Sequence, residues 1–85
     1  MSNRFKYVMF DDVLSDLPVL FPEHCSHDLM AQRIGLPVLS AGMVEMQSNP
    51  EGPGIAAICY GDSISLGVSI RAVDSKIIEK QFRLS

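Results

Sequence analysis

Two apolar stretches on either side of a turn-rich segment constrain the fold of this chain more than any other feature. The stretches are Pro37–Met46 and Gly54–Tyr60, and the segment between them, Gln47–Gly54, contains two prolines and two glycines. This arrangement is typical of two antiparallel strands joined by a wide hairpin loop, in which Asn49–Gly52 suits a type I turn. The expected strands are Val38–Met46 and Ile55–Tyr60.

The segments around this hairpin predict further strands. Phe5–Phe10 is rich in aromatic and β-branched residues and is apolar on both faces, so we expect a strand that is central or covered on both sides. Asp11–Asp16 has the composition of a loop or a single helical turn. Leu17–Phe21 contains Pro18, which offers no N–H to a neighbouring strand, so we expect an edge strand or an extended connection. Ile64–Val68 predicts a short fifth strand.

Two segments carry the signals of short helices. Ser26 is suited to cap a helix over His27–Ile34, and Gly35 to the left-handed position that ends it. A second helix is expected to begin around Ala72–Asp74 and to end near Phe82. Its apolar stripe would consist of Val73, Ile77 and Phe82, with Ile78 at the margin.

These segments predict a single α+β domain over residues 1–85, with the element order β-β-α-β-β-(β)-α. An antiparallel sheet of four or five strands would carry two short helices on one face. Gly42, in the middle of the third strand, indicates a bulge or the close passage of another segment. The apolar content of 47% is more than such a small fold usually covers, which favours a homodimer or another protein contact.

Composition and charge narrow the possible classes of protein. The net charge of −3 has the wrong sign for a general nucleic-acid binder, and no apolar run approaches the length of a membrane span. The first basic residues are followed by Asp11 and Asp12 and not by an apolar segment, so we expect no signal peptide. The expected compartment is the cytoplasm, where Cys25 and Cys59 would be reduced. The sequence does not say whether these two thiols approach each other.

The string Gly-Asp-Ser-Ile at Gly61–Ile64 resembles the nucleophile motif of the GDSL (SGNH) hydrolases, in which Ser63 would attack an acyl carbon. That family recruits an Asp-x-x-His near its C-terminus, whereas both histidines of this chain precede the serine. A serine without a base to activate it is a weak nucleophile. We therefore interpret the string as a turn between strands, with Gly61 in a left-handed conformation. We do not expect this chain to be an enzyme.

Glu23–Asp28 contains five potential metal ligands in six residues. Among them, His24, Cys25 and His27 would suit zinc. A structural zinc site normally takes its remaining ligands from a second cluster, and Cys59 is isolated in the sequence. We favour a polar start to the helix and expect no metal or other cofactor. A metal-binding or small hydrolase site at these residues is the alternative.

The basic C-terminal segment supports a further alternative. Lys76 and Lys80 fall on the polar side of the second predicted helix, with Arg71 before it and Arg83 after it. Nucleic-acid contact through this helix is therefore a third possibility, which we rank below protein contact because the chain is acidic as a whole.

Several segments are similar to small uncharacterised proteins of bacteria and their phages or prophages, which have about this length. The similarity runs through Leu39–Val44, Cys59–Gly67 and Arg71, and more loosely through Phe21–Glu23 and Ser26–Asp28. That group has no settled activity, so no residue role is transferred. The resemblance implies a phage-linked context, in which a small acidic protein often binds and blocks another protein.

The function that the sequence favours is therefore non-enzymatic. We expect a protein-binding module that acts by contact with a protein partner or by self-association, with its remaining apolar surface, at an edge strand, as the contact area.

Overall fold

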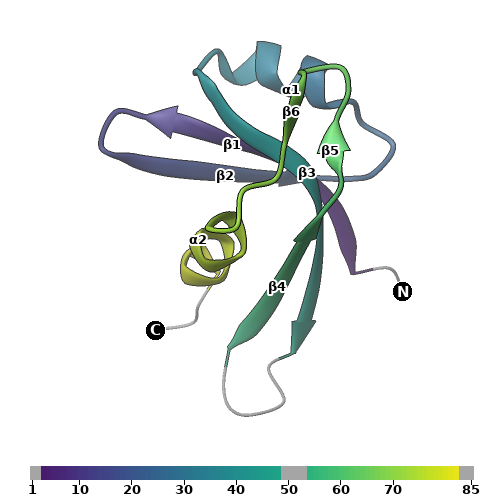
Figure 1. The fold of residues 1–85 in the computed structure, drawn as a ribbon, viewed down its shortest axis with the longest axis vertical. Helices are drawn as coiled ribbons and strands as arrows, with labels where there is room; N and C mark the ends of the chain where they lie inside the picture. Colours follow the sequence, from purple (N-terminus) through teal and green to yellow (C-terminus); the bar gives the residue numbers. More distant parts are fainter. Residues whose placement is uncertain (1–2, 49–53, 83–85) are drawn as a thin grey trace.

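The computed structural model describes residues 3–48 and 54–82, and within them it contains a four-stranded antiparallel sheet, a separate two-stranded sheet and two helices (Figure 1). The predicted small α+β domain is confirmed. The elements in chain order are β1 (Arg4–Asp12), β2 (Ser15–Phe21), α1 (His27–Ile34), β3 (Val38–Ser48), β4 (Ile55–Tyr60), β5 (Asp62–Ser63), β6 (Val68–Ser69) and α2 (Asp74–Gln81).

The main sheet has the strand order β2-β1-β3-β4. The predicted hairpin is confirmed, since β3 and β4 pair from Ser48 with Ile55 to Met43 with Tyr60. The turn predicted at 49–52 lies outside the described residues. Strand β2, which contains Pro18, is at an edge of the sheet, as expected from the missing N–H.

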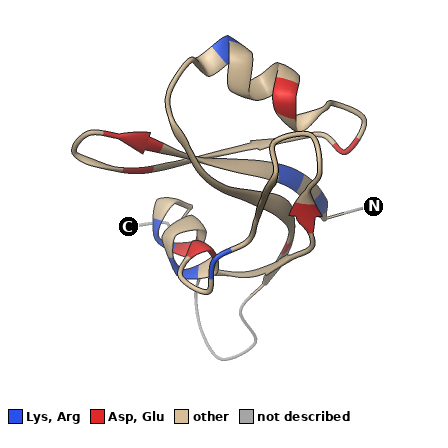
Figure 2. Ribbon diagram, turned by 45° about the horizontal axis from the view of Figure 1, so that its top comes forward, with Lys and Arg blue, Asp and Glu red and all other residues tan. Residues whose placement is uncertain are grey.

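The prediction that both helices lie on one face of the sheet is wrong. Side chains alternate along β1, so Tyr7 and Met9 pack with Ile78 of α2, whereas Val8 and Phe10 pack on the side of α1. Figure 2 shows α1 above the strands and α2 below them. The reason is that β1 is apolar on both sides, and each side needs a cover to exclude water.

The predicted fifth strand is also wrong. Residues 64–67 form a turn between the two-residue strands β5 and β6, which pair with each other and not with the main sheet. The backbone N–H of Gly67 donates to the carbonyl oxygen of Ser63 at 2.9 Å, and the φ of Gly67 is 69°. This left-handed glycine closes a tight turn where the alternating pattern predicts an extended strand.

Helix α1 has the bounds that the sequence predicts, with Ser26 in the N-cap position and Gly35 at the left-handed φ of 76°. The Ser26 side chain makes no capping hydrogen bond. Its hydrogen bond to Asp28 is the main cause of the lowered pKa of that carboxyl group. The apolar stripe of helix α2 differs from the predicted one. Ile78 is fully buried, whereas Val73 and Phe82 are about half exposed.

The close passage expected at Gly42 is confirmed. A Cβ atom at this position would lie 2.5 Å from Cγ2 of Ile70 and 2.9 Å from the carbonyl oxygen of Tyr60. The segment between β6 and α2 therefore reaches β3 at a point where only glycine leaves room. The register shift of β3 is elsewhere, since Met9 pairs with Ser40 and Phe10 with Val38.

Candidate functional site

The connection between β1 and β2 places two apolar side chains in solvent. The strands pair as far as Asp12 and Ser15, so Val13 and Leu14 alone form the connection. Their exposed fractions are 91% and 95%. Two-residue connections of this kind normally contain asparagine, aspartate or glycine. We call Val13 and Leu14 the hairpin tip.

Val13 has a backbone conformation that is unfavourable for its side chain. Its φ of 48° is in the left-handed region, and no other non-glycine residue in the described part of the chain has a positive φ. A β-branched residue in this region is an outlier, at a cost on the order of 1–3 kcal/mol. The N–H of Leu14 donates to the carbonyl oxygen of Asp12 within the turn. Because such strain is concentrated at functional sites, the tip is a candidate site of contact.

Acidic residues surround the hairpin tip (Figure 2). Asp11 and Asp12, at the end of β1, are exposed. Asp16, near the start of β2, is ion-paired with Arg71, whose Nη2 lies 3.1 Å from Asp16 Oδ2. The tip is therefore an apolar pair that follows two exposed carboxylates.

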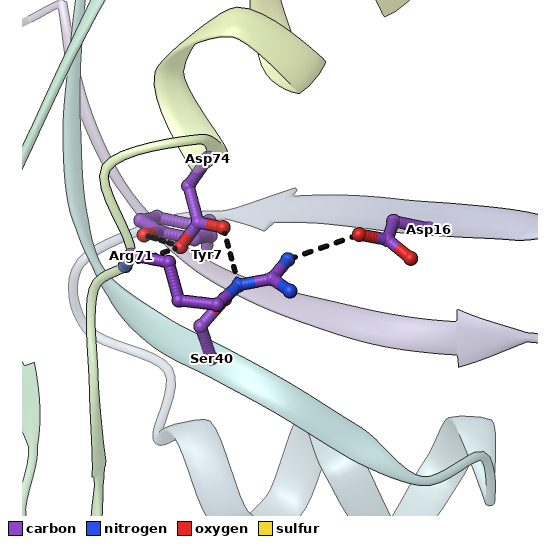
Figure 3. Close-up of polar contacts among 5 residues, drawn as sticks. All are labelled: Tyr7, Asp16, Ser40, Arg71 and Asp74. Atoms are coloured by element: carbon purple, nitrogen blue, oxygen red, sulfur yellow. Dashed lines mark hydrogen bonds and ion pairs between the residues drawn. The ribbon is translucent and has the colours of Figure 1, made fainter.

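Arg71 joins the base of the hairpin to the rest of the fold (Figure 3). Its Nε donates to Asp74 Oδ1 at 3.0 Å and to Ser40 Oγ at 3.2 Å. Its Nη2 donates to Asp16 Oδ2 at 3.1 Å. One guanidinium thus connects β2, β3 and the start of α2, so the hairpin that carries the tip is held in a fixed position.

A buried pair lies behind Arg71 (Figure 3). The hydroxyl of Tyr7 donates to Asp74 Oδ2 at 2.6 Å, and the backbone N–H of Arg71 donates to the same oxygen at 3.0 Å. Burial alone would raise the pKa of Asp74, but hydrogen bonds from Ser40, Tyr7 and the Arg71 backbone outweigh it and lower the pKa. Burial, followed by the contact with Asp74, raises the pKa of Tyr7. Tyr7 and Asp74 have no exposed surface, so this pair serves the fold.

The structure separates the three residues of the proposed metal site. His24 and Cys25 line a pocket of about 330 Å³ beside α1. His27 is buried, where its Nε2 donates to the carbonyl oxygen of Gly42 at 3.0 Å and its ring packs edge-on against Phe21. Within residues 3–48 and 54–82, no three His, Cys, Asp or Glu side chains are placed to hold a metal ion. The described residues therefore provide no ligand set for the proposed metal site.

The two cysteines lie on opposite faces of the sheet. Cys25 packs with the cluster on the α1 side and Cys59 with the cluster on the α2 side, and both are free thiols. A disulfide between them is therefore excluded by the sheet. Burial raises the pKa of the Cys59 thiol to about 11, so this group is protonated and unreactive at neutral pH.

Ser63 is buried and takes part in the turn after β5. Its Oγ lies 3.4 Å from Ser65 Oγ and accepts a hydrogen bond of 3.4 Å from the N–H of Leu66. Gly61 has the expected left-handed φ of 79° between β4 and β5, but Asp62 and Ser63 form strand β5, so the interpretation of the whole string as a turn is wrong in extent. A buried serine with these partners is not placed to attack a substrate.

Arg71 is one of the basic residues that suggest nucleic-acid contact, and it is engaged by Asp16 and Asp74. Lys76 and Lys80 are exposed on α2. The sequence places these residues on a helix correctly, but the pairing of Arg71 removes a cation from any surface for phosphate groups.

The hairpin tip is the feature that sequence reasoning misses. The prediction of a loop or helical turn over Asp11–Asp16 is wrong in extent, because β1 continues to Asp12 and β2 begins at Ser15. The available signal is the apolar pair Val13–Leu14 between acids, where a turn would favour polar residues or glycine.

Neither helix in the described part of the chain is long and apolar enough to cross a membrane. Comparisons of the chain with protein-family models, with curated proteins and with solved structures give no match.

Proposed function

We propose that this chain is a small non-enzymatic protein that binds another protein through the hairpin tip. The observation that carries the proposal is the exposure of two adjacent apolar side chains, Val13 and Leu14, at 91% and 95%. Burial of one valine or leucine side chain is worth about 1.5–3 kcal/mol, and the isolated chain gains none of this at the tip.

The backbone conformation of this turn is also unfavourable for the residues that form it. A two-residue connection with asparagine and glycine would adopt a positive φ without the strain that the β-branched Val13 incurs, and it would expose no apolar side chain. The residues present are therefore unfavourable for the isolated chain, and they become favourable when a partner covers them. This supports a role in contact.

The position of the tip is suited to binding because it is fixed before the partner arrives. Seven residue pairs join β1 to β2, from Lys6 with Phe21 to Asp12 with Ser15. Arg71 then holds Asp16 near the end of this ladder. A contact element that is already ordered loses little conformational entropy on binding.

The edge strands of the sheet are poorly suited to pairing with a strand of another protein. This favours contact through the side chains of the tip. On β4, the N–H of Ala57 donates to Glu79 Oε2 at 2.8 Å. On β2, Pro18 has no N–H to offer. Both edge strands thus have fewer groups available for strand addition.

The phage-linked context that the resemblance implies would make a bacterial protein the partner. We propose the cytoplasm as the compartment in which this contact forms. The acidic residues beside the tip, Asp11 and Asp12, favour an apolar pocket with lysine or arginine at its rim.

Photo-crosslinking from the tip tests this proposal. A diazirine amino acid replaces Leu14 in one variant and Ile64, which is 92% exposed on a different turn, in a matched control. Each variant is irradiated in bacterial extract. We expect an adduct from position 14 that an excess of the unmodified chain suppresses and an equal excess of Leu14→Asp does not. Adducts of equal yield from positions 14 and 64, or equal suppression by both competitors, would contradict the proposal.

A further inference from the structure

Three residues that line the pocket beside α1 carry soft metal-ligand atoms. The pocket has a volume of about 330 Å³, and in its lining His24 has an imidazole, Cys25 a thiol and Met30 a thioether. Among the described residues, no aspartate or glutamate lines it. Thiolate and thioether ligands select Cu(I), and imidazole also binds copper, whereas carboxylates suit magnesium and calcium. We call His24, Cys25 and Met30 the soft-ligand cluster.

We propose that the soft-ligand cluster binds one Cu(I) ion, with the two sulfur atoms and an imidazole nitrogen of His24 as its ligands. The zinc set considered from the sequence contains His27 in place of Met30. The structure removes His27 from that set, because its Nε2 donates to the carbonyl oxygen of Gly42 at 3.0 Å. It brings Met30 to the pocket that His24 and Cys25 line. This proposal uses no residue of the hairpin tip.

The start of helix α1 brings the two sulfur-containing side chains together. Because Ser26 is the N-cap, Cys25 is the residue before the cap and Met30 is the fourth residue of the helix. Side chains at these two positions often pack against each other where a chain enters a helix. Both also pack against the apolar cluster on the α1 side of the sheet. Two aliphatic side chains would serve this packing equally well, and the pair present adds two soft ligand atoms to it.

Hydrogen bonds hold the backbone at Cys25 in place. Its N–H donates to the carbonyl oxygen of Pro22 at 3.0 Å, and its carbonyl oxygen accepts a hydrogen bond of 2.8 Å from Lys6 Nζ. The N–H of Met30 donates to the carbonyl oxygen of Ser26 at 3.3 Å. The segment that carries both sulfur atoms is therefore ordered without an ion, which lowers the entropy cost of binding one. His24 is exposed, and its ring would complete the ligand set.

The charges around the pocket favour a monovalent ion over a divalent one. Arg33 lines the pocket, and the ammonium group of Lys6 contacts the carbonyl oxygen of Cys25. When Cu(I) binds, the Cys25 thiol releases its proton to solvent and a sulfur–copper bond forms, so the thiolate and the ion together have no net charge. Zn²⁺ on the same thiolate would leave a positive charge beside two cations, which is unfavourable. We therefore expect the site to prefer Cu(I) to Zn²⁺.

Competition with a coloured Cu(I) chelator tests the proposal. The untagged chain is titrated without oxygen into the Cu(I) complex of the chelator, and the loss of colour gives the affinity. We expect the wild-type chain to withdraw one equivalent of Cu(I). Met30→Leu keeps the size and apolar character of the side chain but removes its sulfur, and we expect its affinity to fall at least about tenfold. His24→Gln is expected to weaken binding as well, and Cys25→Ser to abolish it.

Matched controls separate this site from nonspecific binding of copper to sulfur. Cys59→Ser removes the thiol on the other face of the sheet, and Met43→Leu removes a thioether from β3. Both variants are expected to bind Cu(I) like the wild type. Two-dimensional nitrogen–proton NMR spectra show whether each variant is folded and which residues respond to the ion. If Cys25→Ser does not fold, Met30→Leu and His24→Gln decide the question.

Three results would overturn the inference: a chelator that keeps all of its Cu(I), a Met30→Leu variant that binds like the wild type, or a Cys59→Ser variant that loses as much affinity as Cys25→Ser. Tighter binding of Zn²⁺ than of Cu(I) would also contradict it. None of these results affects the crosslinking test of the hairpin tip, and Leu14→Asp is expected to bind Cu(I) normally. The two proposals can therefore fail separately.

Discussion

At the scale of single residues, Val13 is where the folded chain departs most from what its own stability favours. It combines an almost fully exposed apolar side chain with a φ of 48°. Leu14 shares the exposure without the positive φ. The two neighbours therefore allow backbone strain and apolar exposure to be measured separately.

Val13→Asn is expected to stabilise the fold, because asparagine tolerates the left-handed region that a β-branched side chain does not. We expect the free energy of unfolding in urea to rise by about 1 kcal/mol. Leu14→Asn is the control, with an expected change close to zero. An equal gain for both variants would attribute the effect to polarity, and a loss of stability in Val13→Asn would contradict the proposed strain.

At the scale of elements, helix α2 covers one face of the sheet and also protects one of its edges. Glu79 accepts a hydrogen bond from the outward N–H of Ala57 in the edge strand β4. At the other edge, Pro18 of β2 has no backbone N–H and therefore offers no hydrogen-bond donor at that position. The edge strand that the sequence suggests for protein contact is thus partly blocked, in a way that depends on how α2 packs.

Glu79→Ala is expected to lower the free energy of unfolding by about 1–2 kcal/mol, because it leaves the N–H of Ala57 without its charged acceptor. It is also expected to increase aggregation on gentle heating, because the freed edge can pair with another chain. Lys76→Ala, on the exposed side of the same helix, is the control and should change neither quantity. Light scattering during a thermal ramp and urea unfolding are the measurements. Equal behaviour of the two variants would show that Glu79 does not protect the edge.

At the scale of the whole molecule, one polar network joins elements that are far apart in the sequence. Tyr7 and Asp74 are 67 residues apart, and Asp16 and Arg71 are 55 residues apart. The network lies on the α2 side of a sheet whose other contacts are mostly apolar. It therefore fixes the position of α2 and of the hairpin by specific hydrogen bonds, where apolar packing alone would tolerate small displacements.

The stability of the fold is expected to depend on pH through Asp74. Its pKa is lower in the folded chain than in the unfolded chain, because hydrogen bonds to the carboxylate outweigh its burial. The stabilisation is therefore complete above the unfolded pKa of about 4 and is lost progressively as the pH falls below it.

Asp74→Asn is expected to cost about 1–3 kcal/mol near neutral pH, since Arg71 and Tyr7 lose a charged acceptor. The difference from the wild type should shrink as the pH is lowered to about 3. Asp62→Asn, which changes an exposed acid outside the network, is the control. Urea unfolding at several pH values gives the free energies. A difference that stays constant with pH would contradict the role assigned to the Asp74 carboxylate.

The sequence by itself determined the elements whose signals are local. Apolar runs around a Pro- and Gly-rich segment gave the β3–β4 hairpin, Ser26 and Gly35 bounded α1, and Pro18 marked an edge strand. These features depend on side chains close together in the chain, so alternation and turn chemistry suffice to predict them.

Only the tertiary structure decided which side of the sheet each helix covers, and with it the network of Arg71 and the exposure of the hairpin tip. Ile78 is fully buried and Leu14 is 95% exposed, although both are apolar residues. Nothing in the residue type itself predicts this difference. That difference depends on which distant elements pack nearby. Local patterns do not contain this information, because burial is a property of the assembled chain.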